Sequence, residues 1–164
     1  MIEANVKARL ERTELLQDAL VQERVCMLDA TTKDAALREM IDILSTCPNI
    51  EDKPDLTRAV FERETLMSTG IGCGLAVPHV RLSSVSKMTM AVGISREGIA
   101  DYASLDDSPV HLIFLIAARE GNHTEYLRLL AAISSRAKDL KGRLVACEDT
   151  ETFCQVFMTP DGEQ

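Results

Sequence analysis

The chain has 164 residues, of which 46% are hydrophobic and 27% charged, so we expect one water-soluble globular domain. Its net charge of −8, with no basic stripe and 4% aromatic residues, argues against binding to nucleic acid or to an anionic membrane surface. The apolar runs are too short to span a membrane, and residues 1–10 lack a signal-peptide core, which predicts a cytoplasmic protein with no direct membrane insertion.

The cysteine pattern argues against covalent or metal cross-links. There are five cysteines, an odd number, and no two of them form a Cys-x-x-Cys pair. This disfavours both a disulfide framework and a thiolate zinc site. We therefore expect free thiols and no metal.

An amphipathic helix is predicted over residues 1–21, ahead of the main domain. Its apolar side chains recur at near-helical spacing, and neither Gly nor Pro interrupts them: Ile2, Val6, Leu10, Leu16 and Leu20. Such a stripe needs a surface to cover it. The helix could pack on the rest of the chain or on a second copy, so a homodimer is one possibility.

Two further helices are predicted before residue 67. The first starts at Thr31 or Thr32, either of which can cap it, and ends at Cys47-Pro-Asn49. The second starts at Asp52-Lys-Pro-Asp55, where proline suits the first turn. Each carries apolar residues on one face.

Strands and helices alternate in the rest of the chain. We expect strands over 75–77, 88–94 and 110–117, the last apolar on both faces and therefore central. A helix should open at Gly121-Asn122, followed by two short helices around 138–146 and 149–158 and a flexible tail at 159–164. The predicted fold class is α/β, with a central mixed β-sheet flanked by helices and an extra N-terminal helix.

A glycine-dense segment, Ser68-Thr-Gly-Ile-Gly-Cys-Gly74, offers a candidate anion site. Successive N–H groups in such a loop can form an anion-binding concavity, to which Ser68, Thr69, Gly70 and Gly72 would contribute. The segment lacks the Gly-Lys-Ser/Thr ending of a Walker loop and the spacing of a Rossmann fingerprint, which disfavours nucleotide binding. Arginines on either side could neutralise phosphate oxygens: Arg63 and Arg81.

The Pro78-His79 pair closes this segment. Proline fixes the approach of the chain, so that the following side chain can be aimed outward at a strand end. Imidazole is largely neutral near pH 7 and suits nucleophilic attack, with one ring nitrogen attacking and the other held by a hydrogen bond. A tight structural turn with an exposed histidine is the alternative interpretation.

The run Arg63-Glu64 … Ser68-Thr-Gly-Ile-Gly-x-Gly-Leu-Ala-Val-Pro-His79 resembles the active-site signature of a known family. That family is the fructose/mannitol (type 2) enzyme IIA of the bacterial phosphoenolpyruvate-dependent sugar phosphotransferase system, which includes the nitrogen-related regulatory enzyme IIA. The similarity continues through Val92-Gly-Ile-Ser, Pro109-Val-His-Leu-Ile-Phe and the later His123-x-x-x-Leu127. It implies a phosphocarrier domain over 22–158.

The resemblance also implies a mechanism. His79 would take a phosphoryl group from the phosphohistidine of an HPr-like carrier and pass it to an enzyme IIB domain, with no cofactor. Arg63 matches the family's phosphate-side arginine, and His123 matches its second active-site histidine. His111, inside an apolar run, is expected to be structural. Many members have Gly after the Pro-His pair, where this chain has Val80-Arg81.

Three functional hypotheses follow. The domain could feed an enzyme IIB in sugar uptake. It could instead be a regulatory binding module, whose docking on a transporter, kinase or transcription protein depends on the phosphorylation of His79. A non-phosphorylated relative that only binds ligands is disfavoured, because His79, His123 and Arg63 are all present.

Overall fold

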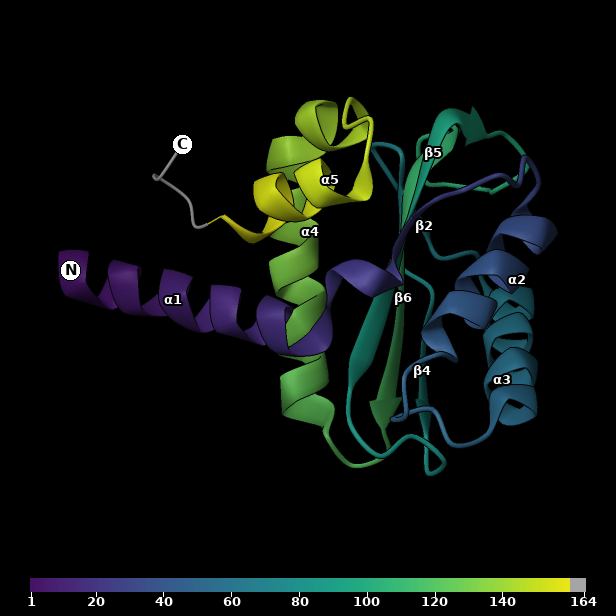
Figure 1. Ribbon diagram of the computed structural model, residues 1–164, viewed down its shortest axis with the longest axis horizontal. Helices are drawn as coiled ribbons and strands as arrows, with labels where there is room; N and C mark the ends of the chain where they lie inside the picture. The colour runs from purple at the N-terminus through teal and green to yellow at the C-terminus, as the bar shows by residue number, and fades with distance from the viewer. Residues whose placement is uncertain (160–164) are drawn as a thin grey trace.

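The computed structural model describes residues 1–159 as a mixed sheet between layers of helices (Figure 1). The elements are α1 (Ile2–Ala19), a short 3-10 turn η1 (Gln22–Arg24), β1 (Val25–Met27), α2 (Lys33–Leu44), α3 (Lys53–Leu66), β2 (Gly70–Gly72), β3 (Leu75–Ala76), β4 (His79–Leu82), β5 (Thr89–Ile99), β6 (Val110–Arg119), α4 (His123–Val145) and α5 (Thr150–Met158). Apart from Thr159, the expected tail at 159–164 lies outside the described residues.

The sheet has the order β1-β5-β6-β3-β2, and β4 pairs with β6 as well. The β5–β6 and β2–β3 pairs are antiparallel and the others parallel, which confirms the predicted mixed sheet. α2 and α3 cover one face, whereas α4 and α5 cover the other (Figure 1). The elements therefore form an α/β sandwich with an added N-terminal helix.

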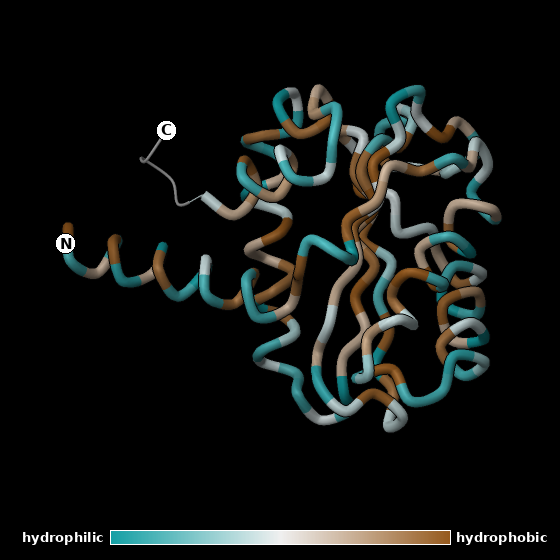
Figure 2. Tube along the Cα trace, viewed as in Figure 1, coloured by the Kyte–Doolittle hydropathy of each residue, from teal (hydrophilic) through white to brown (hydrophobic). Residues whose placement is uncertain are grey.

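β6 is the centre of the core, as its apolar run predicts. Alternate residues enter two separate clusters, because successive side chains of a strand point to opposite faces. Leu112, Phe114 and Ile116 pack toward α4 and α5, whereas Ile113, Leu115 and Ala117 pack toward α2 and α3. The brown strands between the helical layers in Figure 2 show this apolar middle. A sheet buried on both faces gives the site at its edge a rigid base.

Helix boundaries follow the capping signals, with one correction. The side chains of Thr32 and Asp52 accept hydrogen bonds from the third residue beyond them, as expected of N-caps. The separate helix expected at 138–146 is wrong, because α4 runs unbroken to Val145. Ala137 and Leu144 are both buried on the same side of α4, so tertiary packing keeps the polar stretch between them helical.

The glycine-dense segment and the Pro-His pair contain two strands that the sequence did not indicate. β2 begins at Gly70 and turns back antiparallel onto β3. β4 begins at His79 itself, which lies opposite Ile116 of β6 in a parallel pairing. The backbone N–H of Ile116 also donates to the carbonyl of Pro78, at 3.0 Å. The central strand thus fixes the backbone on which His79 stands.

α1 projects from the body and packs mainly through its C-terminal part (Figure 1). Its buried residues are Leu16 and Ala19, whereas Ile2, Val6 and Leu10 are exposed. The predicted apolar stripe is therefore covered at one end. None of the helices in residues 1–159 is both long enough and apolar enough to cross a bilayer.

Candidate active site

His79 lies at the start of β4, and one of its ring nitrogens is already hydrogen-bonded. Its Nδ1 lies 2.7 Å from the carbonyl oxygen of Val77, which can only accept a hydrogen bond. Nδ1 therefore carries the proton, and in the neutral ring the lone pair is on Nε2. The side chain is half-buried. This geometry leaves one defined nucleophilic atom.

The surroundings of His79 keep the ring neutral. Burial lowers the pKa of His79 below its ordinary value of 6.5, and the hydrogen bond to Val77 acts in the opposite direction. The positive charges of Arg63 and Arg81 lower the pKa further. The unprotonated form, which is the one able to attack an electrophile, therefore predominates at pH 7.

Tyr126 of α4 packs against the imidazole. The two ring centroids are 5.5 Å apart and the rings are tilted by 51°. Tyr126 is buried, and that burial raises the pKa of its hydroxyl. The sequence analysis did not assign Tyr126 to the site. Its position three residues after His123, on the same helical face, was the available signal.

A cavity of about 420 Å³ opens beside His79 and contains three arginines. Arg58 is neutralised by Asp55 and Glu62, at 2.5 and 2.8 Å. Arg63 instead donates to the carbonyl of Met67, at 2.8 Å, and no carboxylate of residues 1–159 forms an ion pair with Arg63 or Arg81. Those two cations remain available to an anion.

Arg81 connects this cavity to His123. An Arg81 guanidinium nitrogen lies 2.7 Å from Nδ1 of His123. Since a guanidinium can only donate, Nδ1 of His123 accepts and its proton resides on Nε2. Arg81 also lies over the ring of Tyr126, at 5.5 Å from the centroid. His123 is the exposed first residue of α4, where the free N–H groups of a helix favour an anion.

The polar groups of the glycine-dense segment turn away from the cavity. The hydroxyl of Ser68 donates to the carbonyl of Ala103, at 2.5 Å. The buried hydroxyl of Thr69 forms a short hydrogen bond with Glu64 and lies 2.7 Å from the hydroxyl of Tyr102. Neither residue lines the cavity, and neither Gly70 nor Gly72 does.

The segment acts on His79 through the backbone instead. The carbonyl of Thr69 accepts from the N–H of Val77, at 3.1 Å, and Val77 is the residue whose carbonyl holds the His79 ring. Behind it, Glu64 forms a partly buried ion pair with Lys33, at 2.8 Å. The structure thus brings Arg63, His79, Arg81 and, through Arg81, His123 together, and places the glycine-dense segment in support.

His111 and Cys73 lie outside this group. His111 is paired with the sheet, since its Nδ1 lies 2.8 Å from the carbonyl of Ser95, as expected of a structural histidine. Cys73 is exposed in the β2–β3 turn, and all five cysteines are free. No group of three or more His, Cys, Asp or Glu side chains in residues 1–159 is placed to hold a metal ion.

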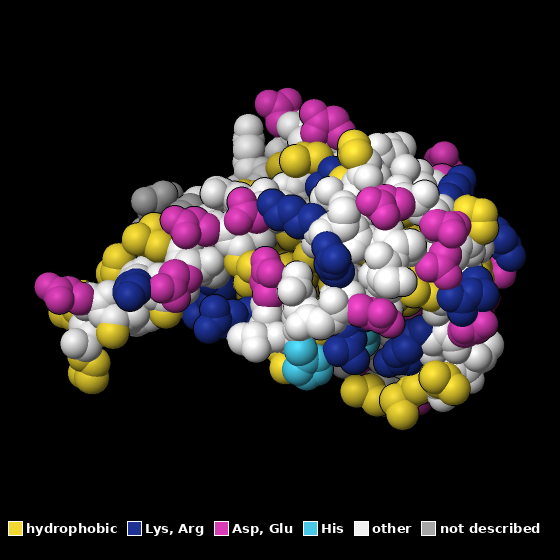
Figure 3. All heavy atoms as spheres, turned by 90° about the horizontal axis from the view of Figure 1, so that it is seen from below, with side chains coloured by type: hydrophobic (Ala, Val, Ile, Leu, Met, Phe, Trp, Pro, Cys, Tyr) yellow, Lys and Arg dark blue, Asp and Glu magenta, His cyan; other side chains and the backbone are white. Residues whose placement is uncertain are grey.

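The face that carries the site is basic with an apolar border. Figure 3 shows histidine beside a group of Lys and Arg side chains, with exposed hydrophobic side chains next to them. Leu66, which lines the cavity, and Met67 are 83% and 70% exposed. Large apolar side chains so exposed beside a charged cleft are typical of a surface that docks another protein.

Comparison with known proteins agrees with this geometry. The sequence model of the family described as "Phosphoenolpyruvate-dependent sugar phosphotransferase system, EIIA 2" matches residues 18–159. The fructose-specific EIIA component of Haloferax volcanii is 32% identical over 128 residues, which are 77% of this chain and 82% of that protein. The fructose-specific EIIABC component of Bacillus subtilis is 31% identical over 151 residues, 91% of this chain but 23% of that larger protein.

Solved structures give the same answer. The crystal structure of the nitrogen regulatory protein IIA-Ntr from Neisseria meningitidis superposes with a TM-score of 0.79 at 26% identity, and the match covers 87% of this chain and 99% of that one. A complex of enzyme IIA mannitol with phosphorylated enzyme IIB mannitol from Escherichia coli matches with a TM-score of 0.69 at 24% identity, over 84% and 96% of the chains, and shows the shared fold. From residue 18 to residue 159, therefore, the chain belongs to the EIIA 2 family of the phosphoenolpyruvate-dependent sugar phosphotransferase system.

Proposed function

We propose that Nε2 of His79 accepts a phosphoryl group from the phosphohistidine of an HPr-like carrier. The observation that supports this most directly is the hydrogen bond from Nδ1 to the Val77 carbonyl, which leaves Nε2 with the lone pair. In the transfer, an Nε2–phosphorus bond forms while the nitrogen–phosphorus bond of the donor breaks, and the donor imidazole leaves with the electron pair. The reaction needs no nucleotide, because the donor is already a phosphoramidate.

The surrounding charges suit this transfer. Phosphoryl transfer depends mainly on positioning and on stabilising charge at the equatorial oxygens. In our proposal Arg63 and Arg81 neutralise those oxygens, and the Nε2 proton of His123 donates to one of them. Thr69 supports the site by holding Val77 through its carbonyl, and Ser68, Gly70 and Gly72 support the loop and strand behind it rather than touch the phosphoryl group.

The phosphorylated domain would then serve one of two kinds of partner. The first is an enzyme IIB domain, of the kind that the E. coli mannitol complex contains, which would take the phosphoryl group onward from the domain at residues 22–158. The second is a protein that the domain regulates by docking on it according to the phosphorylation state of His79; a regulatory role of this kind is in keeping with the N. meningitidis relative, which is named a nitrogen regulatory protein. Both partners would meet the same basic, apolar-edged face, and we place this exchange in the cytoplasm.

Reconstituted phosphorylation tests the proposal. Incubation with phosphoenolpyruvate, enzyme I and HPr should add about 80 Da, one phosphoryl group, to the wild-type chain and nothing to His79→Ala. Phosphorus NMR of the product should identify the Nε2 isomer. Equal labelling of both proteins would refute the assignment of His79, and an Nδ1 product would refute the role given to Val77.

Two arginines of the same cavity provide a matched control. Arg63→Ala should slow phosphoryl transfer more than Arg58→Ala, because Arg58 is already neutralised by two carboxylates. Equal losses would show that net charge in the cavity, and not the position of Arg63, matters. Adding an enzyme IIB to the phosphorylated chain then separates the two roles, since only a transport component loses its label to it.

A further inference from the structure

We infer that the projecting half of α1 inserts into a cleft of a second copy of the chain, so that the protein forms a two-fold symmetric dimer. This inference is independent of the phosphocarrier chemistry. It rests on three observations: an exposed apolar stripe on α1, a cleft between α1 and α4, and the opposite charges of the two.

The projecting half of α1, residues 2–10, exposes large apolar side chains on one face. Ile2, Val6 and Leu10 follow one another at four-residue spacing and are 83%, 40% and 52% exposed. Residues at this spacing share one side of a helix. A helix of this length is marginal in water without a packing partner, so a face of this kind favours association.

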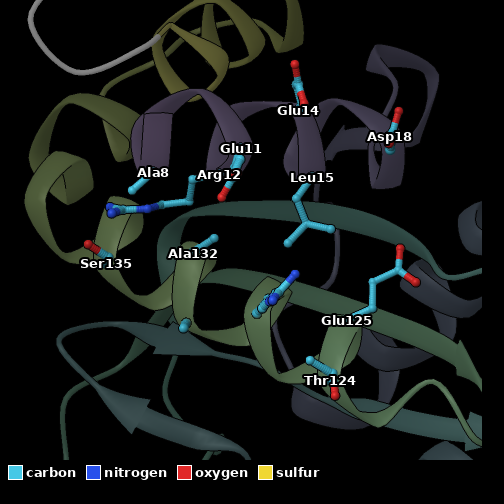
Figure 4. Close-up of a pocket in the computed structure, with 12 residues that line it drawn as sticks. Ala8, Glu11, Arg12, Glu14, Leu15, Asp18, Thr124, Glu125, Ala132 and Ser135 are labelled. Atoms are coloured by element: carbon cyan, nitrogen blue, oxygen red, sulfur yellow. The ribbon is translucent and has the colours of Figure 1, made fainter. Parts of the chain in front are cut away.

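The cleft lies between α1, from Ala8 to Asp18, and the first half of α4, from Thr124 to Ser135. It has a volume of about 1050 Å³, and its apolar lining consists of one leucine and three alanines. Figure 4 shows Leu15 of α1 pointing into this space, with Ala132 on the α4 side. The small side chains of Ala8, Ala131 and Ala132 leave room for the larger side chains of a second helix.

The charges of the two surfaces are complementary. The cleft is lined by four carboxylates, those of Glu11, Glu14, Asp18 and Glu125, against the two guanidinium groups of Arg12 and Arg128. The projecting half carries Lys7 and Arg9 against the single carboxylate of Glu3. Lys7 lies 3.9 Å from Glu11 of its own helix, an exposed pair that contributes little and leaves the other three carboxylates of the cleft unmatched by this half. A basic segment with an apolar face therefore matches an acidic cleft with an apolar floor, which favours this occupant over an acidic partner.

Symmetry makes a second copy the natural occupant. Each chain presents a projecting segment and a cleft, and both involve α1. Two chains related by a two-fold axis can therefore exchange the same contact twice, and the assembly closes at two copies. A different partner would fill the cleft but leave the stripe of α1 uncovered.

Sedimentation of the full chain tests this inference. The wild type should sediment at twice its mass of 18.1 kDa, and Val6→Asp at the single mass. Leu105→Asp is the matched control, since Leu105 is 84% exposed outside α1 and should leave the dimer intact. His79→Ala should also remain dimeric, which separates this inference from the phosphocarrier proposal. A monomeric wild type, or equal dissociation by Leu105→Asp, would overturn the inference.

A charge swap tests which surfaces meet. Lys7→Glu and Glu14→Lys should each weaken the dimer, because each places like charges across both copies of the contact. An equimolar mixture should recover dimers, since the heterodimer pairs opposite charges at both contacts. Circular dichroism would verify that each variant remains folded. Failure of the mixture to associate would refute the insertion of this half of α1 into this cleft.

Discussion

Replacing His123 with alanine should reduce catalysis far more than stability. His123 is exposed, and the contact in which the structure places its ring is the hydrogen bond from Arg81. Exposed pairs of this kind contribute roughly 1 kcal/mol or less to the free energy of unfolding. By contrast, the loss of a preorganised donor to a charged transition state typically costs about 10²–10³ in rate. The two magnitudes differ enough to be separated.

The assay measures the rate of phosphoryl transfer from the phosphorylated carrier together with urea unfolding of the same variant. His123→Gln is the informative control, because its amide can place an N–H donor near the position of Nε2 and should recover part of the rate. A large fall in unfolding free energy with a proportionate loss of rate would refute the catalytic assignment, since His123 would then be a structural residue.

Arg81 provides the second half of the same experiment. Arg81 should act partly by holding His123 in the tautomer with its proton on Nε2, so the double variant Arg81→Ala/His123→Ala should lose less rate than the product of the two single losses. Fully multiplicative losses would show that the two residues act separately. Nitrogen NMR of the His123 ring would show the tautomer directly, and Arg81→Ala should shift it.

Three further predictions concern pH and stability. The folded-state pKa of His79 is lowered below 6.5, so its contribution to stability should fall as pH drops from 6.5 through that lower pKa. Phosphoryl acceptance should fall as the folded ring becomes protonated. His79→Gln should remove this pH dependence from the unfolding free energy. Buried Arg136 donates to the carbonyls of Val156, Phe157 and Thr159, so Arg136→Met should cost about 3 kcal/mol in urea unfolding; a loss below about 0.5 kcal/mol would contradict this. Gly70→Ala places a Cβ 2.2 Å from the Ala103 carbonyl oxygen and should cost at least about 2 kcal/mol, whereas Gly142→Ala, with open space around it, should stabilise α4 by up to about 1 kcal/mol.

Local signals in the sequence were sufficient for much of the fold. The caps at Thr32 and Asp52 and the apolar run of β6 depend on neighbours in the chain, and the structure confirms them. The end of α4 was missed because it depends on distant packing. The three-residue β2 and the short β4 were missed for the same reason, since each exists through its pairing, with β3 and β6 respectively, and no local pattern specifies that pairing.

The same distinction between local signals and distant contacts applies to the site. The Pro78-His79 pair pointed to the proposed nucleophile, but the assignment of its free nitrogen required the position of the Val77 carbonyl. The hydroxyls of Ser68 and Thr69 suggested phosphate contacts because the sequence shows them beside glycines, without showing what lies behind them. The Thr69 hydroxyl is buried, and a buried polar group must find partners, which Glu64 and Tyr102 provide, whereas the partly exposed hydroxyl of Ser68 donates to the Ala103 carbonyl. A motif rich in hydrogen-bonding groups can therefore support a site through the backbone it fixes, and a hydroxyl that is already bonded within the chain, as both of these are, suits that role better than direct contact.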